Sequence, residues 1–289
     1  MPSEIAVVII TKNEERVIEG CLARLKDWAA EIIVVDSLST DRTAQICEAN
    51  GARVIARPWP GSFADQKNFA IRQAKAPWVL ILDADELVDE NLQRELLKAT
   101  REHDENPALV GFQIPTRNYF INGYSDHAWA PDYHVRLIRN HRGIAYDTSS
   151  VVHEKLKCDG VALHNVRPNG ELTKRLDNPI LHYSNTSFSQ IFAKHNMYTT
   201  LEVEKLARSG QGGNLALRIF RPGLCFFYYY FVKRGFRDGV NGFMIALLMF
   251  NYELAVYLKL WEARVTRDRT QSLPESKVAG IPSPSSPPT

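Results

Sequence analysis

An apolar, β-branched run opens the chain and is then repeated. Residues 5–10 read IAVVII, the composition of a strand that is buried on both faces. Similar runs at 32–35, 53–56 and 78–82 alternate with segments such as 17–28, whose apolar residues recur at helical spacing. This alternation predicts an α/β fold with a mostly parallel, doubly wound sheet flanked by helices. In such sheets, ligands bind beyond the carboxyl ends of the strands.

The composition is that of an ordinary globular protein, with 45% hydrophobic and 24% charged residues among 289. The formal net charge of +2 gives no reason to expect nucleic acid as a partner. The four cysteines are far apart and form no CxxC pair, so we expect free thiols in a reducing compartment. The first residues lack the basic and apolar regions of a secretory signal, which favours the cytosol or its membrane face.

The pattern along the chain divides it into four parts. After residue 106, short predicted strands at 111–115, 134–139 and 181–183 replace the regular alternation, and a helix is expected at 189–207. A flexible linker (SGQGGN) precedes a strongly apolar and aromatic segment, and the end of the chain is rich in proline and serine. The expected parts are 1–106, 107–208, 215–265 and a disordered tail at 272–289.

Acidic residues follow two of the buried strands. Asp83 and Asp85 come one residue apart after the strand at 78–82, so their carboxylates can converge on one Mg²⁺ or Mn²⁺ ion. Such an ion neutralises the charge that develops on a diphosphate leaving group. Asp36 ends the strand at 32–35 and can accept hydrogen bonds from a ribose or a base, while the residues after it can cap the next helix. Asn13 is also expected to cap a helix.

Missing motifs exclude several classes of enzyme. No GxGxxG follows the first strand, which disfavours a dinucleotide-dependent oxidoreductase, and no Walker A motif is present. The first loop, at residues 11–14 (TKNE), contains no glycine, which disfavours a nucleotidyltransferase.

Four spaced motifs resemble family 2 inverting glycosyltransferases, which have the GT-A fold. These motifs are residues 9–14 (IITKNE), 35–43 (VDSLSTDRT), 66–70 (QKNFA) and 82–86 (LDADE). The bacterial lipopolysaccharide core glucosyltransferases are the most similar branch, and the later segments RLIR (136–139), VHE (152–154) and LHYS (181–184) extend the resemblance to them. Leu38 departs from the pattern because many members of the family have glycine there.

The resemblance implies a donor-binding role for the first part of the chain and an acceptor role for the second. It implies that the uridine of a UDP-sugar contacts Thr11, Asn13, Glu14 and Asp36, and that its base or ribose lies near Lys67 or Asn68. It implies that Asp83 and Asp85 hold the ribose and the metal, with Asp85 the more direct ligand. It also makes His182 a candidate to complete the metal site or to contact the diphosphate, although a lone histidine is more often structural.

An inverting transfer needs one base to take a proton from the acceptor hydroxyl. Glu154 is the first candidate and Asp132 the second, although each can also be an ordinary surface or turn residue. Arg136, Arg139 and Lys194 are candidates for supporting the donor phosphates.

The segment at 215–265 contains apolar runs such as LCFFYYYFV (224–232) and FMIALLMF (243–250), separated by charged and amide residues. Each run is shorter than the roughly 20 residues of a spanning helix. We therefore expect interfacial helices on the inner membrane, with basic residues on anionic lipid. Packing on the catalytic domain or on a second subunit, and a re-entrant hairpin, are alternatives.

These observations predict a metal-dependent, peripheral membrane glycosyltransferase that uses Mn²⁺ or Mg²⁺. It would move a hexose, most simply glucose, from a UDP-sugar to a lipopolysaccharide core or another lipid-linked glycan. The alternatives are transfer to a polyprenyl phosphate, nucleotidyl transfer, and a non-catalytic membrane scaffold. A homo-oligomer is also compatible with the sequence.

Overall fold

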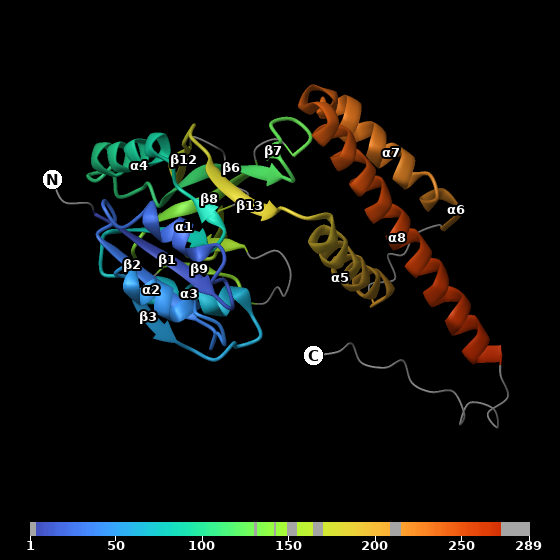
Figure 1. Cartoon of the computed structure of the whole chain (residues 1–289), viewed down its shortest axis with the longest axis horizontal. Helices are drawn as coiled ribbons and strands as arrows, with labels where there is room; N and C mark the ends of the chain where they lie inside the picture. The colour runs from blue at the N-terminus through green and yellow to red at the C-terminus, as the bar shows by residue number, and fades with distance from the viewer. Residues whose placement is uncertain are drawn as a thin grey trace. The chain divides into compact units, whose positions relative to one another are not determined.

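The computed structural model describes residues 4–129, 132–141, 143–148, 155–163, 170–208 and 215–272. It divides into two compact units, residues 1–186 and residues 187–289. The first unit contains all the strands of the described chain, and the second contains only helices there (Figure 1).

The first unit is built on a large mixed sheet with the strand order β3-β2-β1-β4-β8-β6-β13-β5. β12 and β7 pair with β6 beside this path, and a separate small sheet has the order β11-β10-β9. The strands are β1 (Ile5–Thr11), β2 (Glu31–Asp36), β3 (Arg53–Ala56), β4 (Trp78–Asp83), β5 (Glu86–Leu87), β6 (Gly111–Phe120), β7 (Gly123–Tyr124), β8 (Asp132–Arg139), β9 (Ile144–Tyr146), β10 (Leu156–Cys158), β11 (Val161–Ala162), β12 (Thr173–Arg175) and β13 (Ile180–Asn185).

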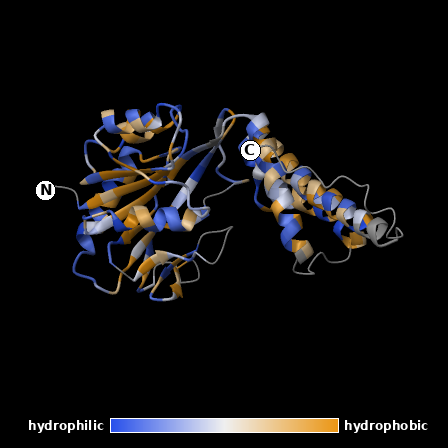
Figure 2. Cartoon of the chain, turned by 90° about the horizontal axis from the view of Figure 1, so that it is seen from below, coloured by the Kyte–Doolittle hydropathy of each residue, from blue (hydrophilic) through white to orange (hydrophobic). Residues whose placement is uncertain are grey.

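Helices cover both faces of this sheet. Alternate residues of β1 and β4 pack on α1 (Ile18–Ala23), α2 (Thr43–Ala49) and α4 (Glu90–Glu102) on one face. The other alternate residues pack on α3 (Phe63–Arg72) and on the small sheet. The strands through the middle of the unit are hydrophobic along most of their length (Figure 2), as burial on both faces requires.

The predicted α/β sheet is confirmed, with one addition. β1 to β4 pair with one another only in parallel, so β1, β2 and β4 end at the same edge, where Thr11, Asp36 and Asp83 are their last residues. β8 then joins β4 and β6 in antiparallel fashion. The register of the β6–β8 pair shifts after Phe112–Leu137, which leaves Arg136 as an extra residue. A bulge of this kind re-aims a side chain, and Arg136 points to the acidic end of β4.

Two local expectations about helix starts were wrong. Asn13 does not cap the first helix, because its side chain accepts a hydrogen bond from the backbone N–H of Thr40. The second helix begins at Thr43 rather than at Ser39 or Thr40. In both cases side chains of one loop bind the backbone of the other, a long-range pairing that capping patterns do not reveal.

The second unit consists of α5 (Phe188–Arg208), α6 (Leu215–Arg218), α7 (Arg221–Phe227) and the long α8 (Gly239–Ser272). A π-helical turn at Tyr228–Val232 and a 3-10 turn at Gly235–Asp238 connect α7 to α8, and α7 lies beside α8 (Figure 1). Gly242 leaves room for this connection, because a Cβ there would collide with the backbone oxygen of Gly235.

Some polar residues of the second unit are bonded within it. Arg221 forms an ion pair of 3.0 Å with Glu253, and Lys259 donates to the side-chain oxygen of Asn196 at 2.8 Å. Residues 235–266 form one helical stretch that is long and apolar enough to cross a membrane, with 28% of its apolar window buried. The run at 224–232 lies in α7 and the π-helical turn, and the run at 243–250 lies in α8, so the two runs belong to separate helices. The expectation that this segment lies on the membrane surface stays a prediction.

Candidate functional site

The loops after β1 and β2 interlock at the carboxyl edge of the sheet. The backbone N–H of Asn13 donates to the hydroxyl of Ser39 at 2.8 Å, and that of Glu14 donates to the hydroxyl of Thr43 at 2.8 Å. The buried Asp36 in turn accepts the backbone N–H of Ser39 at 2.8 Å. The two loops therefore form one rigid wall, which brings together the predicted residues of the first loop and Asp36.

Leu38 keeps the conformation that glycine would favour. Its φ is 60°, in the left-handed region, and its side chain is 52% exposed. A non-glycine residue is strained there by roughly 1–2 kcal/mol. The departure from the family pattern thus leaves the shape of the loop intact at an energetic cost.

Thr11 has an unsatisfied hydroxyl at the same edge. Its side chain is buried, and its Oγ1 has no hydrogen-bond partner in the described part of the chain. Buried hydroxyls are normally hydrogen-bonded, because desolvation without a partner is costly. This hydroxyl is therefore a buried polar group at the end of β1 whose hydrogen-bonding capacity the described residues do not use.

Asp83 is held between two cations. Its Oδ1 lies 3.2 Å from Nζ of Lys67, and its Oδ2 lies 3.5 Å from Nη1 of Arg136. Burial alone would raise the pKa of Asp83, but the charges of Arg136 and then Lys67 outweigh it and hold that pKa well below its usual range. Asp83 is therefore a stable carboxylate whose position is fixed.

Glu86 completes this group beneath the surface. Its side chain is fully buried and accepts two hydrogen bonds of 2.8 Å, one from Nη2 of Arg136 and one from the backbone N–H of Asp83. Burial raises the pKa of the Glu86 carboxyl, and the charge of Arg136 opposes that rise. Burial lowers the pKa of Arg136, but Glu86 and Asp83 reverse the effect and raise it. Glu86 thus anchors the guanidinium that faces Asp83.

Asp85 faces His182 instead. Nε2 of His182 lies 3.4 Å from Oδ2 of Asp85, and both side chains are about a quarter exposed, at 24% and 27%. Nδ1 of His182 lies 2.9 Å from the side-chain oxygen of Asn118, so Nδ1 carries the hydrogen of that bond. Burial lowers the pKa of His182, but its hydrogen bond and charge interaction with Asp85 outweigh burial and raise it.

The predicted three-residue metal set is not assembled. No cluster of three or more His, Cys, Asp or Glu side chains is placed to hold a metal within the described ranges. Asp83 is turned to Lys67 and Arg136, whereas Asp85 and His182 face each other. The carboxylate of Asp85 would nevertheless suit Mn²⁺ or Mg²⁺, and the oriented imidazole nitrogen of His182 would be a further candidate ligand.

Other predicted residues have separate places. Both amide atoms of Asn68 are bonded to the backbone of Tyr146, so this side chain supports β9. Asp132 is exposed and lies 3.1 Å from Nε2 of His134. Arg139 donates to backbone carbonyls such as that of Leu109, and Lys194 belongs to the second unit. Glu154 lies outside the described residues.

Three residues that shape this site have little signal in the sequence. Glu86 lies in a motif that assigns it no role, Asn118 lies in none of the motifs, and Arg136 is a candidate for the donor phosphates and not for Glu86 or Asp83. A glutamate placed directly after a buried strand was the one available signal, because a buried charge needs a partner. Its partner is 50 positions away along the chain.

The fold and this acidic edge define a transferase of the nucleotide-sugar type, and comparison with known proteins agrees. The model of the family described as Glycosyl transferase family 2 matches residues 6–155, and the chain belongs to this family. It is a glycosyltransferase with a GT-A-like fold, as the sequence motifs predicted.

Several relatives match almost the whole chain, among them the following two. The lipopolysaccharide core biosynthesis glycosyltransferase LpsC of Rhizobium meliloti is 30% identical over 271 residues, which is 92% of this chain and 94% of LpsC. An uncharacterized glycosyltransferase of Rickettsia bellii is 30% identical over 91% of this chain and 87% of its own.

Solved structures show more limited similarity. TarS of S. aureus is 17% identical with a TM-score of 0.46, over 70% of this chain and 40% of TarS. Glucosyl-3-phosphoglycerate synthase of Mycobacterium tuberculosis, in complex with Mn²⁺, UDP and glucosyl-3-phosphoglycerate, is 24% identical with a TM-score of 0.31, over 40% of this chain and 43% of the synthase.

Proposed function

We propose that this glycosyltransferase moves a hexose, most simply glucose, from a UDP-sugar to a lipopolysaccharide core or another lipid-linked glycan. The observation that carries the proposal is the set of polar side chains at the shared carboxyl edge of β1, β2 and β4, where Thr11, Asp36 and Asp83 end their strands. The kind of acceptor follows from the similarity to LpsC, which covers 94% of that protein.

The donor nucleoside is assigned to the interlocked loops. The buried carboxylate of Asp36 accepts hydrogen bonds from a base or ribose, and the unpartnered hydroxyl of Thr11 supplies another contact. Asn13 and Glu14 shape this wall through their backbone contacts to Ser39 and Thr43. Asp83, fixed by Lys67 and Arg136, accepts hydrogen bonds from the ribose hydroxyls.

The metal is assigned to Asp85 and His182. The bond between Nδ1 of His182 and Asn118 directs Nε2 toward Asp85, as the outer partners of metal-bound histidines do. A bound Mn²⁺ or Mg²⁺ would supply positive charge to the leaving diphosphate. Asp83 remains with its two cations in this assignment, so the charge of Lys67 and Arg136 also lies beside the donor.

Inversion in a single displacement requires a base at the acceptor hydroxyl. Glu154 remains the proposed base and Asp132 the alternative. Asp132 is exposed and is paired with His134, so its carboxylate is accessible to an acceptor from solvent.

The second unit is proposed to bind the cytoplasmic face of the inner membrane. Phe220, Leu224, Phe227 and Phe231 recur at intervals of three or four residues and are 49–66% exposed, so they form one apolar stripe. Exposed Lys233, Arg234 and Arg237 follow it in the connection to α8. Aromatic residues beside basic ones are typical of segments that lie on anionic lipid. A lipid-linked acceptor would be met at this surface.

The proposal is tested by the release of UDP from UDP-glucose with a purified lipid-linked core acceptor. We expect release to need both the acceptor and Mn²⁺ or Mg²⁺, and to fall about 1,000-fold in Asp85→Ala, because the metal's contribution to charge stabilisation is lost. Unchanged release in Asp85→Ala would contradict the assignment. In Glu154→Gln, an intact rate would instead favour a phosphate acceptor, which needs no base.

A further inference from the structure

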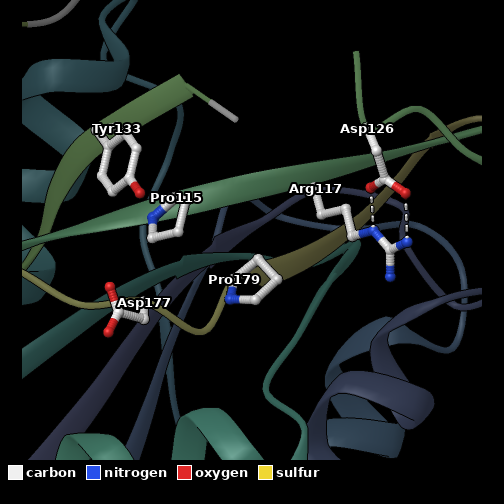
Figure 3. A pocket seen from close by; sticks show the side chains of 6 residues that line it. All are labelled: Pro115, Arg117, Asp126, Tyr133, Asp177 and Pro179. Carbon is white, nitrogen blue, oxygen red and sulfur yellow. Dashed lines mark hydrogen bonds and ion pairs between the residues drawn. The ribbon is translucent and has the colours of Figure 1, made fainter. Parts of the chain in front are cut away.

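A pocket in the first unit lies apart from the residues assigned to the donor. It has a volume of about 340 Å³ and is lined by Pro115, Arg117, Asp126, Tyr133, Asp177 and Pro179 (Figure 3). Small-molecule sites usually have volumes of about 300–1,000 Å³. The pocket can therefore hold a small ligand such as one sugar unit.

The pocket has a fixed polar wall. Nε and Nη2 of Arg117 donate to the two carboxylate oxygens of Asp126, at 2.5 and 2.7 Å (Figure 3). The guanidinium of Arg117 also lies 4.6 Å from the centre of the Tyr124 ring. A bidentate pair that is also stacked on a ring is preorganised, so little conformational freedom is lost when a ligand binds it.

The rest of the lining is mainly apolar and aromatic. Pro115 of β6 lies directly across from Tyr133 of β8, and Arg117 is two residues further along β6, so the three side chains project from one face. The guanidinium of Arg175 lies 4.2 Å from the centre of the Tyr133 ring. The ring of Tyr133 is thereby held in place while it lines the pocket.

A cluster of three half-buried tyrosines, Tyr119, Tyr124 and Tyr183, adjoins the pocket through Arg117. The hydroxyls of Tyr124 and Tyr183 are 2.6 Å apart, and the rings of Tyr119 and Tyr183 are stacked at 4.9 Å. Tyrosine offers an apolar ring together with a hydrogen-bonding hydroxyl. A sugar ring has the matching combination of an apolar C–H face and polar hydroxyls.

The charges of the pocket favour a neutral ligand. Arg117 is balanced by Asp126, and the second carboxylate of the lining, Asp177, is offset by Arg175, which lies on the Tyr133 ring. These carboxylates accept hydrogen bonds from hydroxyl groups and repel phosphates and carboxylates. A neutral, hydroxyl-rich unit therefore fits better than a phosphorylated or acidic sugar.

We infer that the pocket and the tyrosine cluster bind a neutral saccharide unit of the acceptor glycan, away from the point of transfer. Arg117 and Asn118 are consecutive residues of β6, so the pocket and the His182 side chain lie on opposite faces of that strand. That the saccharide belongs to an acceptor glycan rests on the proposed function. That it is neutral and rich in hydroxyl groups rests on the lining of the pocket.

The test is saturation-transfer NMR of the full chain with methyl β-D-glucopyranoside, with UDP and Mn²⁺ present to fill the donor site. For a ligand of this size we expect a dissociation constant of about millimolar. Tyr133→Ala should weaken binding about fivefold or more, since truncation of an aromatic anchor is costly. Tyr198→Ala, the same change at an exposed tyrosine of the second unit, should leave binding unchanged.

Asp177→Ala is the second variant, because Asp177 is exposed and its loss should not impair folding. It should weaken methyl glucoside binding at least threefold. It should also reduce the ratio by which the pocket binds methyl glucoside more tightly than glucose 6-phosphate. Absence of wild-type binding, equal binding in Tyr133→Ala and wild type, or tighter binding of glucose 6-phosphate would each overturn the inference.

The same samples separate this inference from the proposed function. A thermal shift with UDP and Mn²⁺ reports only the donor site. If UDP and Mn²⁺ cause no thermal shift but the saccharide still binds in a way that depends on Tyr133, the donor assignment is contradicted and the saccharide site is supported. If UDP and Mn²⁺ cause a thermal shift but no saccharide binds, the saccharide site is contradicted and the donor assignment is supported.

Discussion

Arg136 donates to the fully buried carboxylate of Glu86 at 2.8 Å, and its other terminal nitrogen lies 3.5 Å from Asp83. The bulge in β8 allows one guanidinium to serve a buried carboxylate and a partly exposed one. The position of Asp83, at the end of β4, thus depends on the buried charge of Glu86.

This dependence predicts a large loss of stability when Arg136 alone is removed. Arg136→Met leaves Glu86 buried without its cation, and we expect a loss of about 3–5 kcal/mol in the free energy of unfolding. Arg136→Met with Glu86→Gln should recover much of that loss, because the buried charge is then gone. Urea unfolding of the wild type, Arg136→Met and the double variant measures these free energies. A double variant no more stable than Arg136→Met would contradict the prediction.

Thr11 is predicted to act on ligand binding and not on folding. Thr11→Val removes a buried hydroxyl that has no partner in the described chain, so the unfolding midpoint should be unchanged or slightly higher. The dissociation constant of UDP should rise about fivefold to tenfold, as measured by calorimetry. Thr116→Val is the matched control, because its hydroxyl is also buried without a partner there, and it should leave UDP binding unaltered.

Asn118 is predicted to act through the orientation of His182. Asn118→Leu removes the acceptor of Nδ1 and should weaken Mn²⁺ binding in the presence of UDP about 10-fold to 100-fold. UDP binding without metal should stay within twofold of wild type. Asn122→Leu, at an exposed turn position, is the control. Wild-type Mn²⁺ affinity in Asn118→Leu would show that this orientation is unimportant.

The basic connection before α8 is predicted to set lipid selectivity. Replacing Lys233, Arg234 and Arg237 by serine should weaken binding to vesicles with anionic lipid about fivefold per residue at low salt. Binding to neutral vesicles should be unaffected, and added salt should reduce the difference. The matched control replaces three exposed basic residues of the first unit, Arg24, Lys26 and Arg101. If both triple variants lost the same affinity for anionic vesicles, a specific role for the connection before α8 would be contradicted.

Much of the first unit was predictable because its signals are local. The continuous apolar runs of β1, β2 and β4 identified a sheet covered on both faces, and the acidic residues Asp36 and Asp83 lie at one edge of it, where β2 and β4 end. In these strands almost all the residues that the apolar pattern predicts to be buried are the ones that the structure buries. In the second unit, the helix expected at 189–207 is observed as α5 (Phe188–Arg208).

The parts that were missed depend on pairing between distant residues. Asp83 is paired with Lys67 and Arg136, and nothing near Asp83 in sequence indicates Arg136 as a partner. Asn13 binds Thr40 in the loop after β2 instead of capping its own helix. Along α8, Glu253 and Lys259 have partners on α7 and α5 that a local pattern does not reveal.

The central claim is that Asp85 and His182 hold the metal against the donor diphosphate. The most direct measurement is calorimetry of UDP binding with and without Mn²⁺, for the wild type, Asp85→Ala and His182→Ala. We predict that Mn²⁺ tightens UDP binding at least about tenfold in the wild type and that each variant loses this gain while keeping its metal-free affinity. A Mn²⁺-dependent gain that persists in both variants would contradict the claim.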